Sequence, residues 1–206
     1  MVYRASPATP FDLPSVDSWR AETDVLIVGG GGTPTQTACG FDDDIEEMHK
    51  YLVLAAGPNA DPQKIRLYCD RTLEHYDWLT QQGVVFKPQY YPHKHTNTPN
   101  EAALMISGNE EAWPYNAQAK PAPRGHKPQI KGDHGGIPLM KNLLRRAKEK
   151  GVQIISDARA LATIKRGAEV VGIVARIDQQ EMCFRAHRGV ILAAGGFIMN
   201  EQMVAD

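Results

Sequence analysis

A short apolar stretch that runs into four consecutive glycines most constrains what this chain can fold into. Residues 24–28 read Asp-Val-Leu-Ile-Val, and Gly29, Gly30, Gly31 and Gly32 follow them. An uninterrupted apolar run of this length is typical of a parallel strand that is covered on both faces. Glycines at its end permit a tight turn and let the backbone approach a pyrophosphate group closely. The stretch therefore predicts the first strand and the phosphate turn of a dinucleotide-binding domain.

The residues after the glycines depart from the usual dinucleotide-binding pattern. Gly29 and Gly31 occupy its first two glycine positions, but Pro34 stands at the third. A helix and a second strand that ends in an acidic residue normally follow. Residues 33–40 read Thr-Pro-Thr-Gln-Thr-Ala-Cys-Gly instead, which predicts a polar loop without a helical period. We therefore expect an incomplete nucleotide-binding unit.

A first helix is predicted at residues 44–56. Asp44 and Glu47 form a plausible capping pair, and Gly57 with Pro58 ends the segment. The apolar patch at residues 51–54 is also compatible with a second strand. The cap and the helical spacing of the apolar residues favour the helix.

Two further helices have clear end signals. Asp61 and Pro62 begin one that extends to about residue 82, where Gly83 ends it. The other follows the glycine-rich turn at 132–136 and covers about residues 138–150.

Residues 84–129, between these two helices, differ from them in composition and in periodicity. Seven prolines alternate with tyrosine, tryptophan and histidine, and no helical period is visible. A long irregular stretch of this kind inside a domain is more often functional than inert. A disordered insertion is the alternative, but the aromatic residues favour packing.

Strand-forming segments dominate the last third of the chain. Runs rich in β-branched residues predict four strands, at 152–156, 160–165, 170–177 and 182–186, the last three of them as a meander. Residues 189–197 read Gly-Val-Ile-Leu-Ala-Ala-Gly-Gly-Phe and predict a further buried strand that ends in a glycine turn. Ligands of doubly wound sheets bind at the carboxyl ends of adjacent parallel strands, so we expect one extended nucleotide beside both turns. A merely structural tight turn at Gly195 and Gly196 is the alternative.

Composition excludes several classes of function. The 206 residues carry a formal charge of −1, which argues against nucleic acid and anionic membranes as partners. No apolar run approaches the roughly 20 residues of a membrane span. Residues 1–22 lack the apolar centre of a signal peptide and are expected to form an N-terminal arm. The three cysteines are far apart and lack metal-ligand spacing, so we expect reduced thiols and a cytoplasmic protein. The acidic run 42–44 is interpreted as helix capping rather than as a metal site.

Three segments together resemble a known family. Residues 23–32, 132–150 and 188–200 are similar to the FAD-binding domain of the fumarate reductase and 3-ketosteroid delta-1 dehydrogenase flavoproteins. The closing segment Leu-Ala-Ala-Gly-Gly-Phe at 192–197, with Asn200 after it, matches the family pattern most specifically. The resemblance implies an α/β fold, namely an incomplete Rossmann-like FAD-binding domain with an antiparallel meander and an inserted, mostly helical cap-like region. Residues 23–32 and 131–206 would form the discontinuous FAD-binding domain, and residues 33–130 the cap or substrate insertion.

The resemblance also implies a cofactor and site residues. FAD would lie with its pyrophosphate at Gly29, Gly30, Gly31 and Gly32. Small residues would lie along its adenosine half, namely Ala160, Ala193, Ala194, Gly195 and Gly196. On the substrate side the candidates are Tyr91, Arg124 and His134, because arginine can hold a carboxylate and tyrosine or histidine can exchange a proton. The substrate would be a small molecule, steroid-like or dicarboxylate-like, and no metal is implied.

The chain is shorter than the family pattern. The first helix and the second strand of the pattern are missing between Gly32 and Thr33, and family members continue beyond the position of Asp206. The expected function is an FAD-dependent oxidoreductase that exchanges a hydride between a substrate carbon and the flavin. The missing segments favour, as an alternative, a non-catalytic remnant or partner-binding fragment. A nicotinamide-dependent enzyme is a third reading, which the lack of an acidic ribose ligand disfavours.

Overall fold

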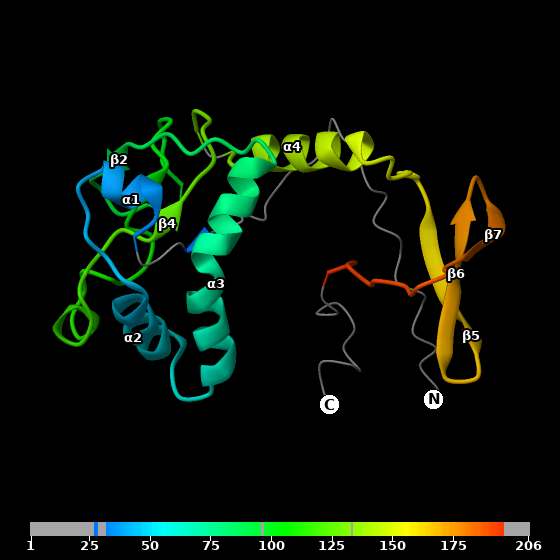
Figure 1. Ribbon diagram of the computed structural model, residues 1–206, viewed down its shortest axis with the longest axis horizontal. Coiled ribbons are helices and arrows are strands. Elements are labelled where there is room, and N and C mark those ends of the chain that lie inside the picture. Colours follow the sequence, from blue (N-terminus) through cyan, green and yellow to red (C-terminus); the bar gives the residue numbers. More distant parts are fainter. Residues whose placement is uncertain (1–26, 29–31, 96, 133, 196–206) are drawn as a thin grey trace, which may run out of the picture. The chain divides into compact units, whose positions relative to one another are not determined.

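The chain divides into two units in this computed structural model, which describes residues 27–28, 32–95, 97–132 and 134–195. Among the described residues, those up to 152 belong to the first unit and residues 153–195 to the second. Helices, short strands and long connections make up the first unit, and a small sheet makes up the second (Figure 1).

The segment after Gly32 forms a short helix, α1 (Pro34–Ala38), where the sequence predicts a loop. Thr33 Oγ1 accepts a hydrogen bond from the Gln36 backbone N–H at 3.2 Å, and Gln36 Oε1 accepts one from the Thr33 N–H at 3.1 Å. This reciprocal capping box, with Pro34 in the first turn, begins the helix. The loop prediction is wrong because five residues are too few to show a helical period.

The two longer helices of the first half are confirmed. Helix α2 (Ile45–Ala56) begins where Asp44 Oδ1 accepts a hydrogen bond from the Glu47 N–H at 2.8 Å. Helix α3 (Pro62–Gln81) begins at Asp61, whose Oδ1 accepts from the next turn. Residues 51–54 are therefore helical rather than a strand. Among the described residues, no helix has both the length and the apolar character that a membrane span requires.

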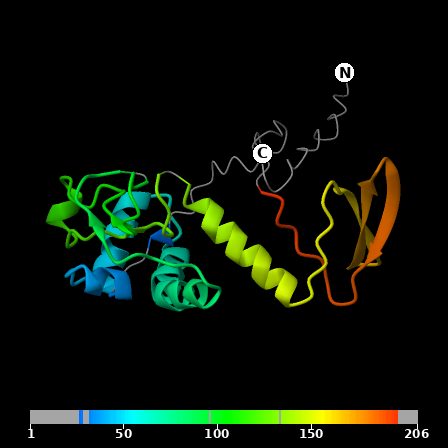
Figure 2. The same ribbon diagram turned by 90° about the horizontal axis from the view of Figure 1, so that it is seen from above.

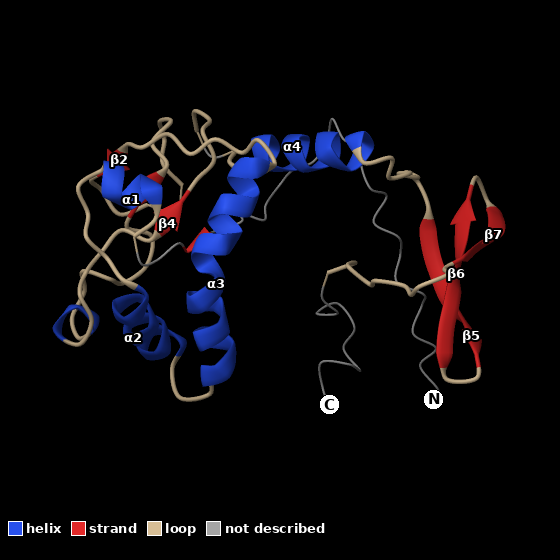
Figure 3. Cartoon of the chain, viewed as in Figure 1, coloured by secondary structure: helices blue, strands red, loops and turns tan. Residues whose placement is uncertain are grey.

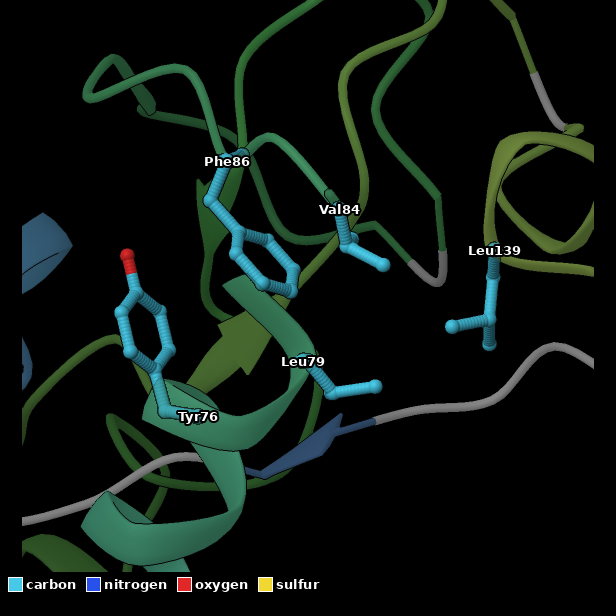
Figure 4. Close-up of a cluster of buried hydrophobic side chains, with 6 residues drawn as sticks. Tyr76, Leu79, Val84, Phe86 and Leu139 are labelled. Carbon is cyan, nitrogen blue, oxygen red and sulfur yellow. The ribbon is translucent and has the colours of Figure 1, made fainter. Parts of the chain in front are cut away.

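An apolar cluster joins α3 to α4 (Gly136–Glu149), the third predicted helix. The Tyr76 and Phe86 rings stack with centroids 5.0 Å apart, and the side chains of Leu79, Val84 and Leu139 complete one side of the cluster (Figure 4). Leu139 is the contribution of α4. The cluster fixes the end of α3 and the start of α4 against the same chain segment at 84–86.

A small sheet forms the other side of the first unit. Its strands are β1 (Ile27–Val28), β2 (Tyr90–Tyr91), β3 (Leu104–Met105) and β4 (Gly125–His126), in the order β1-β4-β3-β2. β4 is antiparallel to both of its neighbours, and β2 is parallel to β3. The sequence predicts β1 as a central parallel strand, and within the described residues this is wrong, because β1 pairs with β4 in antiparallel register. Residues 24–26 of the predicted strand lie outside the described residues.

The long connection between α3 and α4 consists mostly of loops and turns (Figure 3), and its burial shows that it is packed rather than disordered. Residues 102–106 and 122–128 are buried almost throughout. The buried apolar side chains of this connection are mainly small or aliphatic. Its tryptophan, Trp113, is 81% exposed and adds little to the packing. The expectation of a packed segment is confirmed, although its predicted cause, the aromatic residues, explains only part of it.

A buried lysine holds this connection together. Lys127 Nζ donates hydrogen bonds to the carbonyl oxygens of Thr98 at 2.6 Å, Asn100 at 2.7 Å and Gly132 at 3.0 Å. An ammonium group has three N–H donors, so these bonds use its full capacity and compensate the burial of its charge. Lys127 thereby connects the loop at 98–100 with the glycine-rich turn before α4.

The second unit is an antiparallel meander of β5 (Arg159–Arg166), β6 (Glu169–Ile177) and β7 (Gln180–Arg185), which confirms the three strands predicted there (Figures 1 and 2). The strands predicted at 152–156 and 189–197 are wrong within the described residues, because neither 152–156 nor 189–195 pairs with a neighbouring strand. Residues 196–197 of the second prediction lie outside the described residues. Ile191 and Leu192 are 92% and 76% exposed. A strand exists only where a neighbour supplies hydrogen bonds, and an apolar run cannot provide that neighbour by itself.

Replacing Lys127 by methionine is expected to lower the free energy of unfolding by about 2 kcal/mol, because three carbonyl oxygens lose a charged donor. Urea unfolding followed by circular dichroism measures the change. Lys131→Met is the matched control, since Lys131 is exposed and a few residues away. Equal losses in both variants would contradict the role given to the Lys127 ammonium.

Candidate functional site

A buried ion pair lies at the centre of the first unit. Arg124, directly before β4, donates from Nε to Asp43 Oδ2 at 2.8 Å and from Nη2 to Asp43 Oδ1 at 2.6 Å. Both side chains are completely buried. The guanidinium also donates to the Lys120 carbonyl at 3.1 Å. Two parallel charge-assisted bonds are the geometry in which arginine holds a carboxylate most specifically.

The capping residues of α1 extend this network to β4. Gln36 Nε2 donates to Asp43 Oδ2 at 3.2 Å and to the Pro123 carbonyl at 3.0 Å. Thr33 Oγ1 lies 3.0 Å from His126 Nε2. His126 Nδ1 lies 3.1 Å from the Arg124 carbonyl, and since a carbonyl only accepts, Nδ1 carries the proton. The residues that begin α1 are therefore bonded to the strand that follows Arg124.

A second group of polar residues lies on the other side of Arg124. The Tyr51 ring is 5.4 Å from the Arg124 guanidinium carbon, and its hydroxyl accepts a hydrogen bond from the Asn109 N–H at 2.9 Å. Glu110 is only 2% exposed. Burial raises the pKa of the Glu110 carboxyl, against smaller lowering effects of nearby backbone N–H groups and of Arg124. Burial raises the pKa of Tyr51 as well.

The network has a consequence for the ligands that this unit can bind. Asp43 neutralises Arg124, and carbonyl oxygens occupy the Lys127 ammonium. Neither of these buried cations is free to bind the carboxylate of a ligand.

The three predicted substrate-side residues do not come together. Tyr91 lies in β2, half-buried, with its ring near those of His93 and His95 at 5.4 and 6.3 Å. Arg124 is paired with Asp43, and His134 is exposed directly before α4. No hydrogen bond, ion pair or ring contact joins any two of the three predicted residues, all of which the structure describes. Asp43 already compensates the charge of Arg124, and the role of Arg124 as a ligand of a substrate carboxylate stays a prediction.

The predicted pyrophosphate turn lies partly outside the described residues, which include Gly32 but not Gly29, Gly30 or Gly31. Gly32 has φ +81°, a conformation that favours glycine. At the start of α1 the Gln36 N–H bonds Thr33 Oγ1, and the Thr37 N–H bonds the Thr33 carbonyl at 3.0 Å. The pyrophosphate role of the turn stays a prediction.

The predicted adenosine-side residues belong to the second unit. Ala160 lies in β5, and Ala193, Ala194 and Gly195 follow the meander, all of them exposed. Gly196 lies outside the described residues. The described residues of the predicted cofactor set thus belong to two different units, and their role stays a prediction.

Sequence reasoning missed the residues that form the buried network, notably Asp43, Tyr51 and Glu110. The sequence predicts helix capping for the acidic run 42–44, and this holds for Asp44 alone. Asp43 differs from its neighbours only in the direction of its side chain, which a sequence does not display. In the part of the chain that the structure describes, no three metal-ligating side chains come together.

Comparisons with known proteins agree with the resemblance drawn from the sequence. The model of a family described as FAD binding domain matches residues 29–205. A solved 3-ketosteroid-delta4-(5alpha)-dehydrogenase from Rhodococcus jostii RHA1, in complex with 4-androstene-3,17-dione, is 44% identical, with a TM-score of 0.82 over 87% of this chain and 38% of that one. An open-conformation flavocytochrome c3 fumarate reductase is 24% identical, with a TM-score of 0.62 over 86% of this chain and 28% of that one, and shows a similar fold.

Two curated proteins are also similar to this chain. An NADH:acrylate oxidoreductase of Vibrio harveyi is 27% identical over 171 residues, and an NADH:fumarate oxidoreductase of Klebsiella pneumoniae (strain 342) is 22% identical over 162 residues. Each match covers 78% of this chain. The chain spans only 14% and 15% of the length of these two relatives.

Asp43→Asn is expected to destabilise the protein by about 3–5 kcal/mol, because it leaves the Arg124 charge buried without its partner. Chemical denaturation at neutral pH measures the loss. Asp42→Asn is the matched control: Asp42 is the neighbouring residue and forms only an exposed ion pair with Lys120 at 3.2 Å, a class of interaction that contributes about 0–1 kcal/mol. A similar small effect in both variants would contradict the central role of Asp43.

Glu110→Gln is expected to gain stability relative to the wild type as the pH rises from about 4 to neutrality. The folded protein binds the Glu110 proton more tightly than the unfolded chain does, so the wild type loses stability once the carboxyl must ionise while buried. Unfolding of both proteins across this pH range provides the comparison. Glu111→Gln, at the exposed neighbouring position, is expected to show no such trend.

Proposed function

The chain belongs to the family of FAD-binding flavoproteins that includes fumarate reductase and 3-ketosteroid dehydrogenase, and we propose that it acts as an FAD-dependent oxidoreductase. FAD is the cofactor of this family, and when bound it supplies the hydride chemistry. The protein would position the substrate and keep water and charge away from the reacting atoms. The match of residues 29–205, most of the chain, supports this proposal.

A neutral ketone, such as a steroid ketone, is the proposed substrate class. The pairing of Arg124 with Asp43 is the observation that carries this choice, because a dicarboxylate needs a free cation and the two buried cations are occupied. A ketone oxygen needs only a hydrogen-bond donor. Tyr91 is the residue that we propose for this role, since its half-buried phenol can donate to a carbonyl without adding a charge.

The organisation of the chain is proposed to follow the family. Residues 23–32 and 131–206 would contribute to the FAD-binding domain, and residues 33–130, with Tyr91, to the substrate side. Residues 1–22 would form an arm, and the protein would work in the cytoplasm.

The visible spectrum of the purified protein tests the cofactor, and anaerobic reduction tests the substrate. We expect a flavin spectrum in stoichiometric amount, or its recovery when FAD is added. We expect a saturated steroid ketone to bleach the flavin absorbance, and succinate to leave it unchanged. Tyr91→Phe is expected to slow the bleaching by about 100-fold, whereas Tyr90→Phe, at the preceding position in β2, should not. Bleaching by succinate alone would overturn the proposed substrate class.

A non-catalytic, partner-binding fragment is the second candidate. The exposed side chains of Ile191 and Leu192 favour it, because an apolar segment at 92% and 76% exposure is one that a binding partner would cover. A folded, colourless protein that cannot be reconstituted with FAD would support this candidate and overturn the oxidoreductase.

A further inference from the structure

Helix α3 carries a row of exposed side chains on the side opposite its buried one. The helix lies beside α2 (Figure 1), and its buried residues lie on one side. Four exposed residues at spacings of four, three and four lie nearly opposite them, and we call them the α3 stripe: Leu67, Arg71, Glu74 and Trp78. Alternating spacings of four and three are those of residues that meet a partner helix in a coiled coil.

The two ends of the α3 stripe are large apolar side chains. Leu67 is 58% exposed and Trp78 is 46% exposed. The His75 ring stacks against the Trp78 indole, with centroids 6.0 Å apart and planes 16° apart, and supports it along the helix surface. Tryptophan is enriched at protein interfaces, because its ring buries a large area with few rotatable bonds. Both ends of the stripe can therefore supply apolar contact to a partner.

The middle of the α3 stripe carries two opposite charges. Arg71 Nη1 lies 3.7 Å from Glu74 Oε2, and the two side chains are 69% and 72% exposed. An exposed pair of this kind contributes about 0–1 kcal/mol to stability. Both charged groups can therefore turn towards a partner at little cost to the fold.

The order of the four residues complements itself when it is reversed. A two-fold axis beside residues 72 and 73 runs a second α3 antiparallel to the first. Leu67 then lies against Trp78 of the second copy, and Arg71 lies against Glu74 of the second copy, and each contact occurs twice. Apolar side chains meet at both ends and opposite charges meet in the middle. We propose that two copies of this chain associate through the α3 stripe in this antiparallel register.

Charge favours this arrangement over its alternatives. A parallel pair would place Arg71 against Arg71 and Glu74 against Glu74, which are repulsive contacts. An unrelated partner would need to match both halves of the stripe, whereas a second copy does so by symmetry. Asp70 flanks the stripe, but Arg66 already pairs with it at 2.6 Å and offsets its charge.

The association is expected to be weak and reversible. One short row of side chains from each copy buries less than the roughly 1,200–2,000 Å² of a stable interface, so we expect a dissociation constant on the order of 100 µM. None of the four residues belongs to the proposed substrate or cofactor set. The association is therefore expected both with and without bound FAD.

Sedimentation velocity of the full chain, from about 10 µM to about 1 mM, tests the proposal. We expect the sedimentation coefficient to rise with concentration towards that of a dimer. Arg71→Glu and Glu74→Arg each place like charges at both central contacts and should weaken the association by about 10-fold or more. Lys141→Glu and Glu111→Arg make the same types of charge change at exposed positions outside α3 and should leave it unchanged.

An equimolar mixture of the Arg71→Glu and Glu74→Arg variants is the decisive sample. Each central contact between the two variants again joins opposite charges, so the mixture should associate although neither variant does alone. The double variant that carries both changes should associate as the wild type does, and it decides the question if a single variant fails to fold. Circular dichroism checks the helix content of each variant. A wild type that stays monomeric to 1 mM, an association that both single variants leave intact, or a mixture and a double variant that stay monomeric would each overturn the proposal.

Discussion

The buried ion pair between Asp43 and Arg124 is the interaction on which the first unit depends. It joins the residue before the α2 cap to the residue before β4, and each partner holds a further element. Gln36 bonds the carboxylate and thereby fixes α1, while the Tyr51 ring covers the guanidinium and thereby fixes α2. A buried pair of this kind adds little net stability compared with an apolar core, but it tolerates few alternative arrangements. Its contribution is to specify which segments meet.

Local signals allowed the sequence to predict the helices, and nothing comparable exists for the buried network. Asp44 and Asp61 are the N-caps of α2 and α3, and each accepts a hydrogen bond from an N–H three residues later. A signal this local can be read directly from the sequence. Asp43 and Arg124 are separated by 81 positions, and Thr33 and His126 by 93. No pattern within a short window reveals such pairs. The strands predicted at 152–156 and 189–197 are not found in the described residues for a related reason, because an apolar run indicates a possible strand but not the neighbour that it must pair with.

Family membership and the charges of the first unit support different parts of the proposed function. The match over residues 29–205 assigns the cofactor, whereas the described residues of the predicted cofactor set are divided between two units. The interior of the first unit contributes the substrate argument, since its buried cations are compensated by Asp43 and by carbonyl oxygens. The proposed preference for a neutral ketone rests on this compensation.

The separation of Thr33 from His126 also sets an order of events during folding. Closing a chain segment of this length loses considerable entropy before any contact stabilises it, whereas α2 and α3 close only short loops. The helices can thus form and collapse first, and the bonds of Thr33, Gln36 and Asp43 to the strand at 125–126 follow. Until they do, the charges of Asp43 and Arg124 remain hydrated. The joint burial of the Asp43 and Arg124 charges would then be the slow, cooperative step between the collapsed chain and the native state.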